Sequence, residues 1–163
     1  MAPNPATAPN LFDRALLAAR LSRARRAGAA TFLLERVTAD MADRLQAVSR
    51  SFSAAADLWT PGDGLGDALR GRVGSVDPIG FSEAEALGLP PESLYLMVSA
   101  LAFQFVNDLP GVLAQIRRAL KPDGLLLAAM LGGDTLTELR QSFAAAEAEC
   151  EGGVSPRVAP FAD

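Results

Sequence analysis

The sequence contains no histidine and a single cysteine among its 163 residues. Without histidine it lacks the commonest general base, the commonest zinc ligand and every Ser-His or Cys-His catalytic pair. Cys150 has no partner for an internal disulfide, and its alanine-rich surroundings favour a small core residue over a nucleophile. We therefore predict no metal site and a reducing compartment, the bacterial cytoplasm in preference to the mitochondrial matrix.

Aromatic residues are also scarce, at 6% of a chain that is half hydrophobic. Alanine and leucine dominate the apolar fraction, which suits helices packed on a sheet better than a β-sandwich. The longest nearly unbroken apolar run, Leu94 to Val106, has 13 residues, fewer than the roughly 20 that span a bilayer. The composition predicts one α/β domain and no transmembrane segment.

Basic residues are concentrated near the N-terminus of a chain whose net charge is −4. Residues 1–50 carry eight arginines and four acids, whereas residues 51–163 carry seven basic residues and 15 acids. No aromatic residue lies among the arginines between Arg14 and Arg26, and the acidic remainder repels phosphates, so we predict no nucleic-acid binding. The basic segment is expected to dock on its own domain or on a protein partner.

Three regions follow from the apolar patterns. Residues 1–10 hold three prolines and no periodicity, which predicts a disordered leader. Residues 11–50 have helical spacing with a break near Gly28, which predicts a helical extension. Residues 51–163 alternate short apolar runs with helical segments, the pattern of parallel βαβ units.

The last region contains four predicted strands, AAADL, RVGSVDPIGF, LYLMVSAL and GLLLAAML. A helix over 108–120 is predicted between the last two, with Asp108 as its N-cap and KPDG as its end. A final helix over 134–150 begins with DTLTE, where Thr135 and Glu138 can form a capping box. The side chains expected to be buried by this helix are Leu136, Leu139 and Phe143.

Four motifs follow in order from Val106 to Phe161: VNDLP, LKPDG, GGDTLTELR and EGGVSPRVAPF. LKPDG is shared widely among class I S-adenosylmethionine (SAM) dependent methyltransferases. The four together resemble a narrower family, the bacterial and mitochondrial proteins related to respiratory complex I assembly factor 5, and FDRALL and FLLERVTADMADRL resemble its N-terminal segment. The resemblance implies a Rossmann-like parallel sheet flanked by helices, with SAM over the carboxyl ends of the first strands.

The resemblance also implies that the first strand ends in an acid followed by alternate glycines, and two registers of DLWTPGDGLG match this pattern in part. In one register Asp57 is the acid, and Trp59 and Pro61 replace the first two glycines. In the other register Thr60 replaces the acid. The glycines of this second register are Gly62, Gly64 and Gly66. Both registers supply candidate SAM-binding residues.

Before the LPPES segment the family has a strand, a helix and a strand, but this chain has room for one strand and a short helix. A βα unit is therefore expected to be missing, leaving an incomplete methyltransferase-like domain over 51–163. Two further acids are candidates by resemblance: Asp77 for the ribose hydroxyls, if GSV is the second strand, and Glu83 for the adenine. Tyr95 stands where the family has an aspartate.

Methyl transfer from a sulfonium needs alignment and desolvation more than an acid or base, so the sequence names no catalytic residue. Two function classes stay open. The first is a SAM-dependent methyltransferase-like enzyme of unknown acceptor, acting on a protein in complex I assembly as the resemblance implies. The second is a binding or assembly protein that keeps the fold and has lost SAM. The altered loop predicts weak or no SAM binding, and uncovered apolar strands predict self-association.

Overall fold

A computed structural model describes residues 10–82 and 84–162. The chain divides after Ala129 into two units, and each is described by itself. The predicted disordered leader lies outside the described residues, except for Asn10.

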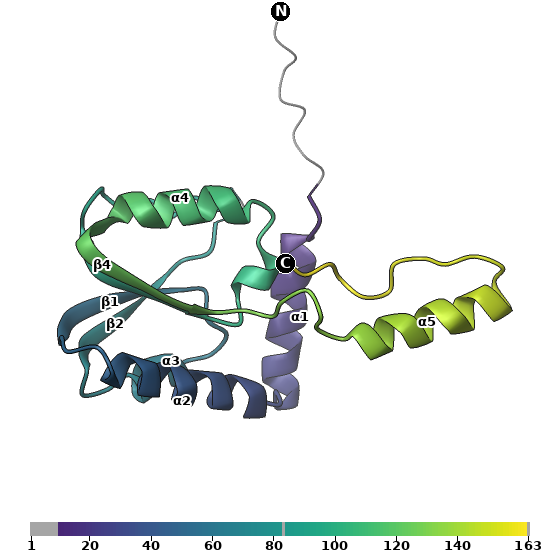
Figure 1. Ribbon diagram of the computed structural model, residues 1–163, viewed down its shortest axis with the longest axis horizontal. Coiled ribbons are helices and arrows are strands. Elements are labelled where there is room, and N and C mark those ends of the chain that lie inside the picture. The colour runs from purple at the N-terminus through teal and green to yellow at the C-terminus, as the bar shows by residue number, and fades with distance from the viewer. Residues whose placement is uncertain (1–9, 83, 163) are drawn as a thin grey trace, which may run out of the picture. The chain divides into compact units, whose positions relative to one another are not determined.

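The first unit is built on a four-stranded parallel sheet with the order β2-β1-β3-β4 (Figure 1). Its strands are β1 (Phe52–Leu58), β2 (Val73–Ile79), β3 (Leu94–Ala100) and β4 (Leu120–Ala129). β1 is an inner strand, because its Ala56 pairs with Asp77 of β2 on one side and with Met97 of β3 on the other. The four predicted strands and the Rossmann-like parallel arrangement are confirmed.

Helices cover both faces of this sheet (Figure 1). α2 (Phe32–Gln46) and the short α3 (Gly64–Ala68) lie on one face, and α4 (Leu109–Ala119) lies on the other. The core on the α2 side includes the buried side chains of Met41, Leu45, Leu65, Leu69, Leu96 and Val98. Apolar residues at helical spacing in α2 and α4 thus give each face of the sheet its cover.

α1 (Arg14–Ala27) stands at the end of the sheet where the strands finish (Figure 1). Asp13 caps it by accepting a hydrogen bond from the Leu16 amide, and Gly28 ends it at φ +81°. Glycine suits this left-handed position because it has no Cβ. The predicted break near Gly28 is confirmed.

α4 confirms the helix predicted over 108–120. The Asp108 carboxylate accepts a hydrogen bond from the Gly111 amide at 2.9 Å, and Pro110 lies in the first turn. KPDG ends the helix as expected, but it is not a loop, since these residues already belong to β4. A register irregularity opposite Leu94–Leu96 accommodates them.

The connections between strands are short before β3. α3 alone joins β1 to β2, and the described part of the 80–93 connection to β3 contains no helix or strand. Because β2 and β3 flank β1 on opposite sides, the chain direction across the sheet reverses at β1. This connectivity has one βα step fewer than the resemblance implies.

The second unit contains α5 (Thr137–Cys150), which begins three residues later than predicted. The predicted capping box of Thr135 and Glu138 is wrong, because Leu136 occupies the N-cap at φ +60° and no side chain caps it. The Thr135 amide instead donates to the Gly132 carbonyl in a preceding turn, which takes Thr135 away from the cap position.

Burial in α5 also differs from the prediction. Residues 130–162 contain one helix and, apart from an isolated bridge between Gly132 and Ala162, no strand. The unit therefore has no second layer of secondary structure against which an apolar face of α5 could pack. The side chains expected in the core are each more than 40% exposed: Leu136, Leu139 and Phe143. Cys150, predicted as a core residue, is exposed for the same reason.

One buried carboxylate organises the second unit. Glu147, 8% exposed, accepts hydrogen bonds from the Ser155 amide at 2.7 Å and the Ser155 hydroxyl at 3.0 Å, and Arg157 donates to it as well. The Ser155 amide and the Arg157 guanidinium hold the pKa of this carboxyl below its usual range. Two residues of the EGGVSPRVAPF motif, Ser155 and Arg157, therefore hold the chain after α5 against that helix.

Candidate functional site

A cavity of about 340 Å³ lies at the carboxyl ends of β1, β2 and β3. Asp57 lines it from β1 and Ile79 from β2, and Leu101 lines it directly after β3. α1 forms the facing wall with residues that include Arg14 and Leu17. Open parallel sheets bind ligands at the carboxyl ends of their strands, where the strand order reverses, so this cavity is the candidate functional site.

Asp57 is the buried acid of the cavity, at 9% exposure. Burial raises the pKa of its carboxyl, while hydrogen bonding to Thr60 opposes that shift. The Thr60 amide donates to Asp57 Oδ1 at 3.3 Å, a long hydrogen bond. A carboxylate has about four acceptor sites, so Asp57 retains the capacity to bind donors of a ligand.

Hydrogen bonds between neighbouring strands fix the loop after Asp57. The Thr60 hydroxyl accepts a hydrogen bond from the Ala100 amide at 2.9 Å, and the Ser99 hydroxyl donates to the Leu58 carbonyl at 2.8 Å. Both hydroxyl-bearing residues are buried. The end of β3 thereby positions the cavity-lining loop of β1.

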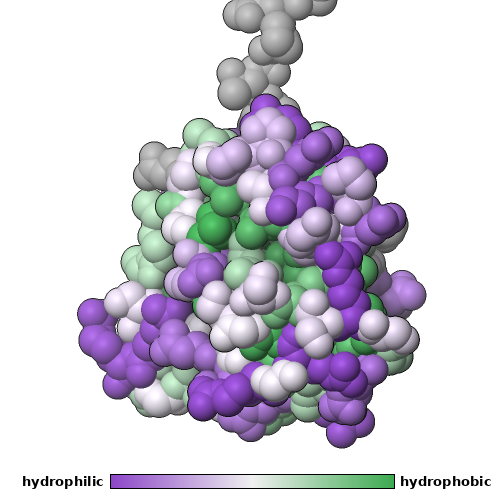
Figure 2. All heavy atoms as spheres, turned by 90° about the vertical axis from the view of Figure 1, so that its left-hand side faces the viewer, coloured by the Kyte–Doolittle hydropathy of each residue, from purple (hydrophilic) through white to green (hydrophobic). Residues whose placement is uncertain are grey.

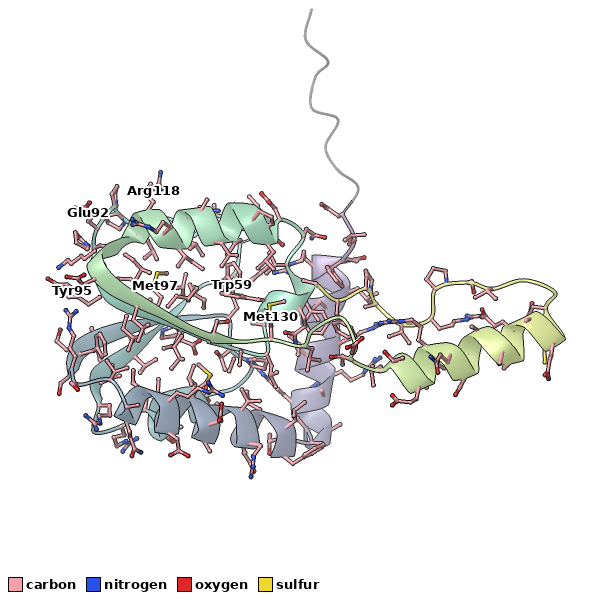
Figure 3. All side chains as sticks on the ribbon, in the orientation of Figure 1. Trp59, Glu92, Tyr95, Met97, Arg118 and Met130 are labelled. Carbon is pink, nitrogen blue, oxygen red and sulfur yellow. The ribbon has the colours of Figure 1, made fainter. Side chains whose placement is uncertain are left out.

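Trp59 lies in the loop after Asp57 and has an unusual backbone conformation. Its backbone adopts φ +65°, a left-handed conformation that costs a residue other than glycine roughly 1–2 kcal/mol. Its ring (labelled in Figure 3) contacts Phe81 edge-on, with centroids 5.1 Å apart, and its Nε1 donates to the Gly80 carbonyl at 3.4 Å. Glycine adopts a left-handed conformation most readily, so the backbone at position 59 is compatible with the register in which Trp59 replaces a glycine. That register stays a prediction.

The three glycines of the other register have separate places. Gly62 lines the cavity with φ +80°. Gly64 begins α3, and Gly66 lies inside α3, where an added Cβ would be 3.7 Å from Val76. Only Gly62 of the three is brought to the cavity.

The remaining sequence candidates lie elsewhere. Asp77 is exposed in the middle of β2 and does not line the cavity, and Glu83 lies outside the described residues. Tyr95 lies at the opposite end of the sheet from α1 (Figure 3), between the Arg50 guanidinium at 4.1 Å and the Lys121 ammonium at 4.4 Å from its ring. Figure 2 faces that end of the molecule, where hydrophobic residues gather near the middle and hydrophilic ones lie mostly at the edges. The roles of Asp77 and Glu83 in binding SAM stay predictions.

Arg14 belongs to the basic segment expected to dock on its own domain or on a partner, but its place at the cavity was not predicted; its side chain is only 9% exposed. Its guanidinium carbon lies 3.6 Å from the Phe81 ring centroid, its Nη1 is 3.6 Å from Glu85 Oε1, and it donates to the Phe105 carbonyl. Burial lowers the pKa of Arg14, while the Glu85 charge raises it. The sequence signal was present, since FDRALL places one arginine on the leucine face of a basic helix.

Glu85, also missed, is 5% exposed and has φ +53°. Its two carboxylate oxygens accept hydrogen bonds from the Asn107 amide at 2.8 Å and the Asp108 amide at 2.9 Å. The Asn107 side chain in turn accepts from the Phe12 amide at 2.9 Å and donates to the Phe12 carbonyl at 3.2 Å. Asp108 alone caps α4, and Asn107 holds the chain at the start of α1.

Neither a metal site nor a membrane-spanning helix is observed among the described residues. Over residues 10–82 and 84–162, no group of three or more histidine, cysteine or acidic side chains could hold a metal ion. In that same part of the chain, no helix combines the length and apolarity needed to cross a membrane.

Known proteins of the same fold include methyltransferases. A methyltransferase domain family matches residues 66–128. A candidate SAM-dependent methyltransferase structure from Methanococcus maripaludis is similar with a TM-score of 0.52 at 15% identity, covering 85% of this chain and 72% of that one. The sheet and the helices that flank it are those of the class I methyltransferase fold.

Proteins that are similar in sequence indicate a narrower group within this fold. The human arginine-hydroxylase NDUFAF5, mitochondrial, is 35% identical over 187 positions and 99% of this chain; a malonyl-[acyl-carrier protein] O-methyltransferase from Xylella fastidiosa is 42% identical over 50% of it. The chain spans 54% of the human protein's length and 25% of the Xylella protein's length. The chain therefore has the class I methyltransferase fold and is similar in sequence to NDUFAF5 over nearly its whole length.

Proposed function

We propose that this chain binds SAM in the cavity at the carboxyl ends of β1 to β3 and acts on a protein side chain. The observation that carries the proposal is Asp57, a buried carboxylate that ends β1 at the strand-order reversal and lines the cavity. The relationship to SAM-dependent methyltransferases supports the same ligand.

The cavity residues fit the two ends of SAM better than the ribose between them. Asp57 would accept hydrogen bonds from the amino group of the methionyl end, and Ile79 and Phe81 would cover the flat face of the adenine ring. The end of β2 and the residues after it, Pro78 to Gly80, offer no carboxylate for ribose hydroxyls. When bound, SAM supplies a methyl group on a sulfonium, and the chain contributes alignment and, through α1, exclusion of water.

The names of the relatives suggest two substrates, an arginine, which the one relative hydroxylates, and a malonyl group on a carrier protein, which the other methylates. We favour an arginyl side chain of a protein, because the similarity to the arginine hydroxylase extends over nearly the whole chain. Respiratory complex I assembly in the bacterial cytoplasm is the proposed setting, and an assembly protein is the proposed partner. A reducing compartment suits the one exposed thiol, Cys150.

Trp59 favours a second candidate function, a binding or assembly protein that keeps the fold without SAM. Its indole occupies the place of a glycine beside Asp57, where a ligand would need close approach to the backbone. Pro61, which also lines the cavity, removes a backbone N–H donor. Both features weaken SAM binding without affecting the sheet.

Calorimetric titration of SAM into the chain separates the two functions. We expect a dissociation constant weaker than about 10 µM, because of Trp59 and Pro61. Asp57→Asn should weaken SAM binding about tenfold more, the loss of one charge-assisted contact, whereas Asp43→Asn, an exposed control in α2 that does not line the cavity, should leave it unchanged. Equal binding by Asp57→Asn would contradict the site, and no binding at millimolar SAM would establish the second function.

A further inference from the structure

Arg14 lies in surroundings that match a guanidinium group on three sides. The Phe81 ring covers its face at 3.6 Å, the Glu85 carboxylate lies 3.6 Å from Nη1, and the Phe105 carbonyl accepts a hydrogen bond. Guanidinium is planar, weakly hydrated and rich in donors, so an aromatic face with a carboxylate and a carbonyl recognises it better than an ammonium. We call Phe81, Glu85 and the Phe105 carbonyl the guanidinium site.

This site continues the cavity of the proposed function. Arg14, Phe81 and Phe105 line the cavity, and Glu85 lies behind Arg14. Removal of the Arg14 side chain would therefore extend the cavity as far as a buried carboxylate. Glu85 stays in place without Arg14, because the Asn107 and Asp108 amides hold both of its oxygens.

Arg14 fills the guanidinium site incompletely. Its Nε is buried and has no hydrogen-bond partner among the described residues. A buried donor without a partner is rare and costly, so the arginine of α1 is not the best occupant that this site could have.

Apart from the contacts of Arg14, few interactions attach α1 to the sheet. None of its residues is buried as a whole, and Leu16 and Leu21 are 46% and 37% exposed. The main polar attachments are Arg14 itself and the two hydrogen bonds between Asn107 and the Phe12 backbone. A helix held this way can leave the cavity without disturbing the buried core.

We propose that the guanidinium site binds an arginyl side chain of a partner polypeptide, and that Arg14 of α1 occupies it until that side chain displaces α1. The partner rests on the proposed function, but the site does not, since it requires no SAM. α1 is then both the lid of the cavity and an internal competitor for its substrate.

The test measures binding of N-acetyl-arginine amide to the full chain without SAM, with N-acetyl-lysine amide as the matched ligand. Arg14→Ala should bind the arginine compound with a millimolar dissociation constant, at least about tenfold tighter than the unmodified chain, whose Arg14 competes. Adding Phe81→Leu should abolish this gain, and Phe81 is exposed enough, at 44%, for the fold to tolerate the change. Equal binding with and without Arg14, or equal binding of the lysine compound, would overturn the proposal.

A second variant leaves Arg14 in place. Asn107→Ala removes the hydrogen bonds to Phe12 and should raise affinity for the arginine compound, whereas Asp108→Ala, which removes only the α4 cap, should not. Melting temperatures show whether each variant is folded. If Arg14→Ala does not fold, restoration of folding by methylguanidinium, but not by methylammonium at equal ionic strength, supports the site, and failure of both refutes it. Because SAM is absent throughout, loss of SAM binding leaves this result unaffected.

Discussion

Because the backbone at Trp59 is left-handed, we expect a glycine variant to be more stable there than an alanine variant, the reverse of the usual order. Both Trp59→Gly and Trp59→Ala remove the ring and its edge-on contacts with Phe81 and Phe103, at 5.1 and 6.3 Å. Such pairs are worth about 0.5–1.5 kcal/mol each beyond the apolar area that they bury, so both variants should lose at least roughly 1–3 kcal/mol of unfolding free energy. Only glycine also relieves the conformation at φ +65°.

The difference between the two variants isolates that conformation. In an ordinary strand, glycine is less stable than alanine by roughly 0.5–1 kcal/mol, because its unfolded state is more flexible. A left-handed alanine costs about 1–2 kcal/mol that glycine does not pay. We therefore expect Trp59→Gly to be more stable than Trp59→Ala by about 0.5–1 kcal/mol.

Urea unfolding followed by circular dichroism measures the difference, since Trp59 is the only tryptophan and its fluorescence is lost in both variants. Ser53, exposed in β1 without a positive φ, supplies the control pair, in which Ser53→Ala should be more stable than Ser53→Gly. If alanine is also the more stable residue at position 59, the backbone there is not left-handed and the assignment of Asp57 as the family's acid loses its support.

Further predictions concern charge and association. Burial raises the pKa of Asp57, so its ionisation destabilises the fold at neutral pH; Asp57→Asn should raise the urea midpoint at pH 7, and the gain should vanish as pH falls below about 4. The pKa of Glu147 is lowered, so the hydrogen bonds by which it holds residues 151–162 should be lost as pH falls through that pKa. Limited proteolysis should show faster cleavage within residues 151–162 in Glu147→Gln than in Glu149→Gln, whose side chain is exposed. Anisotropy at physiological salt should detect no DNA or RNA binding, and retained binding lost in Arg20→Glu would show the opposite. Sedimentation should show self-association, because β4 pairs on one side only within the described sheet; a clean monomer at high concentration would contradict this.

The sheet and α4 could be predicted because their signals are local. Apolar runs bounded by glycine and proline mark the strands, and Asp108 before Pro110 marks the helix start whatever the rest of the chain does. α5 shows the limit of this reasoning. DTLTE has the composition of a capping box, but the turn that Thr135 makes with Gly132 takes precedence.

The candidate site was predictable only in part, because its decisive contacts join distant segments. Asp57 and Gly62 could be proposed from one loop, but the left-handed backbone of Trp59, which is compatible with the Asp57 register, is not visible in the sequence. The pairing of Arg14 with Glu85 has no sequence periodicity, since it depends on how α1 crosses the strand ends. Helix packing of this kind is set by tertiary structure rather than by local propensity.

The VNDLP motif connects these observations. Its Asn107 side chain holds the start of α1, its Asp108 side chain caps α4, and the amides of both fix the Glu85 carboxylate opposite Arg14. A motif that carries much of the family resemblance thus holds the chain before α1 and the carboxylate of the proposed guanidinium site, whereas the loop after β1 departs from the pattern that the resemblance implies. If the cavity functions, the intact motif favours control by α1 and by an arginyl ligand over tight cofactor binding, which makes α1 the first element to remove in any search for activity.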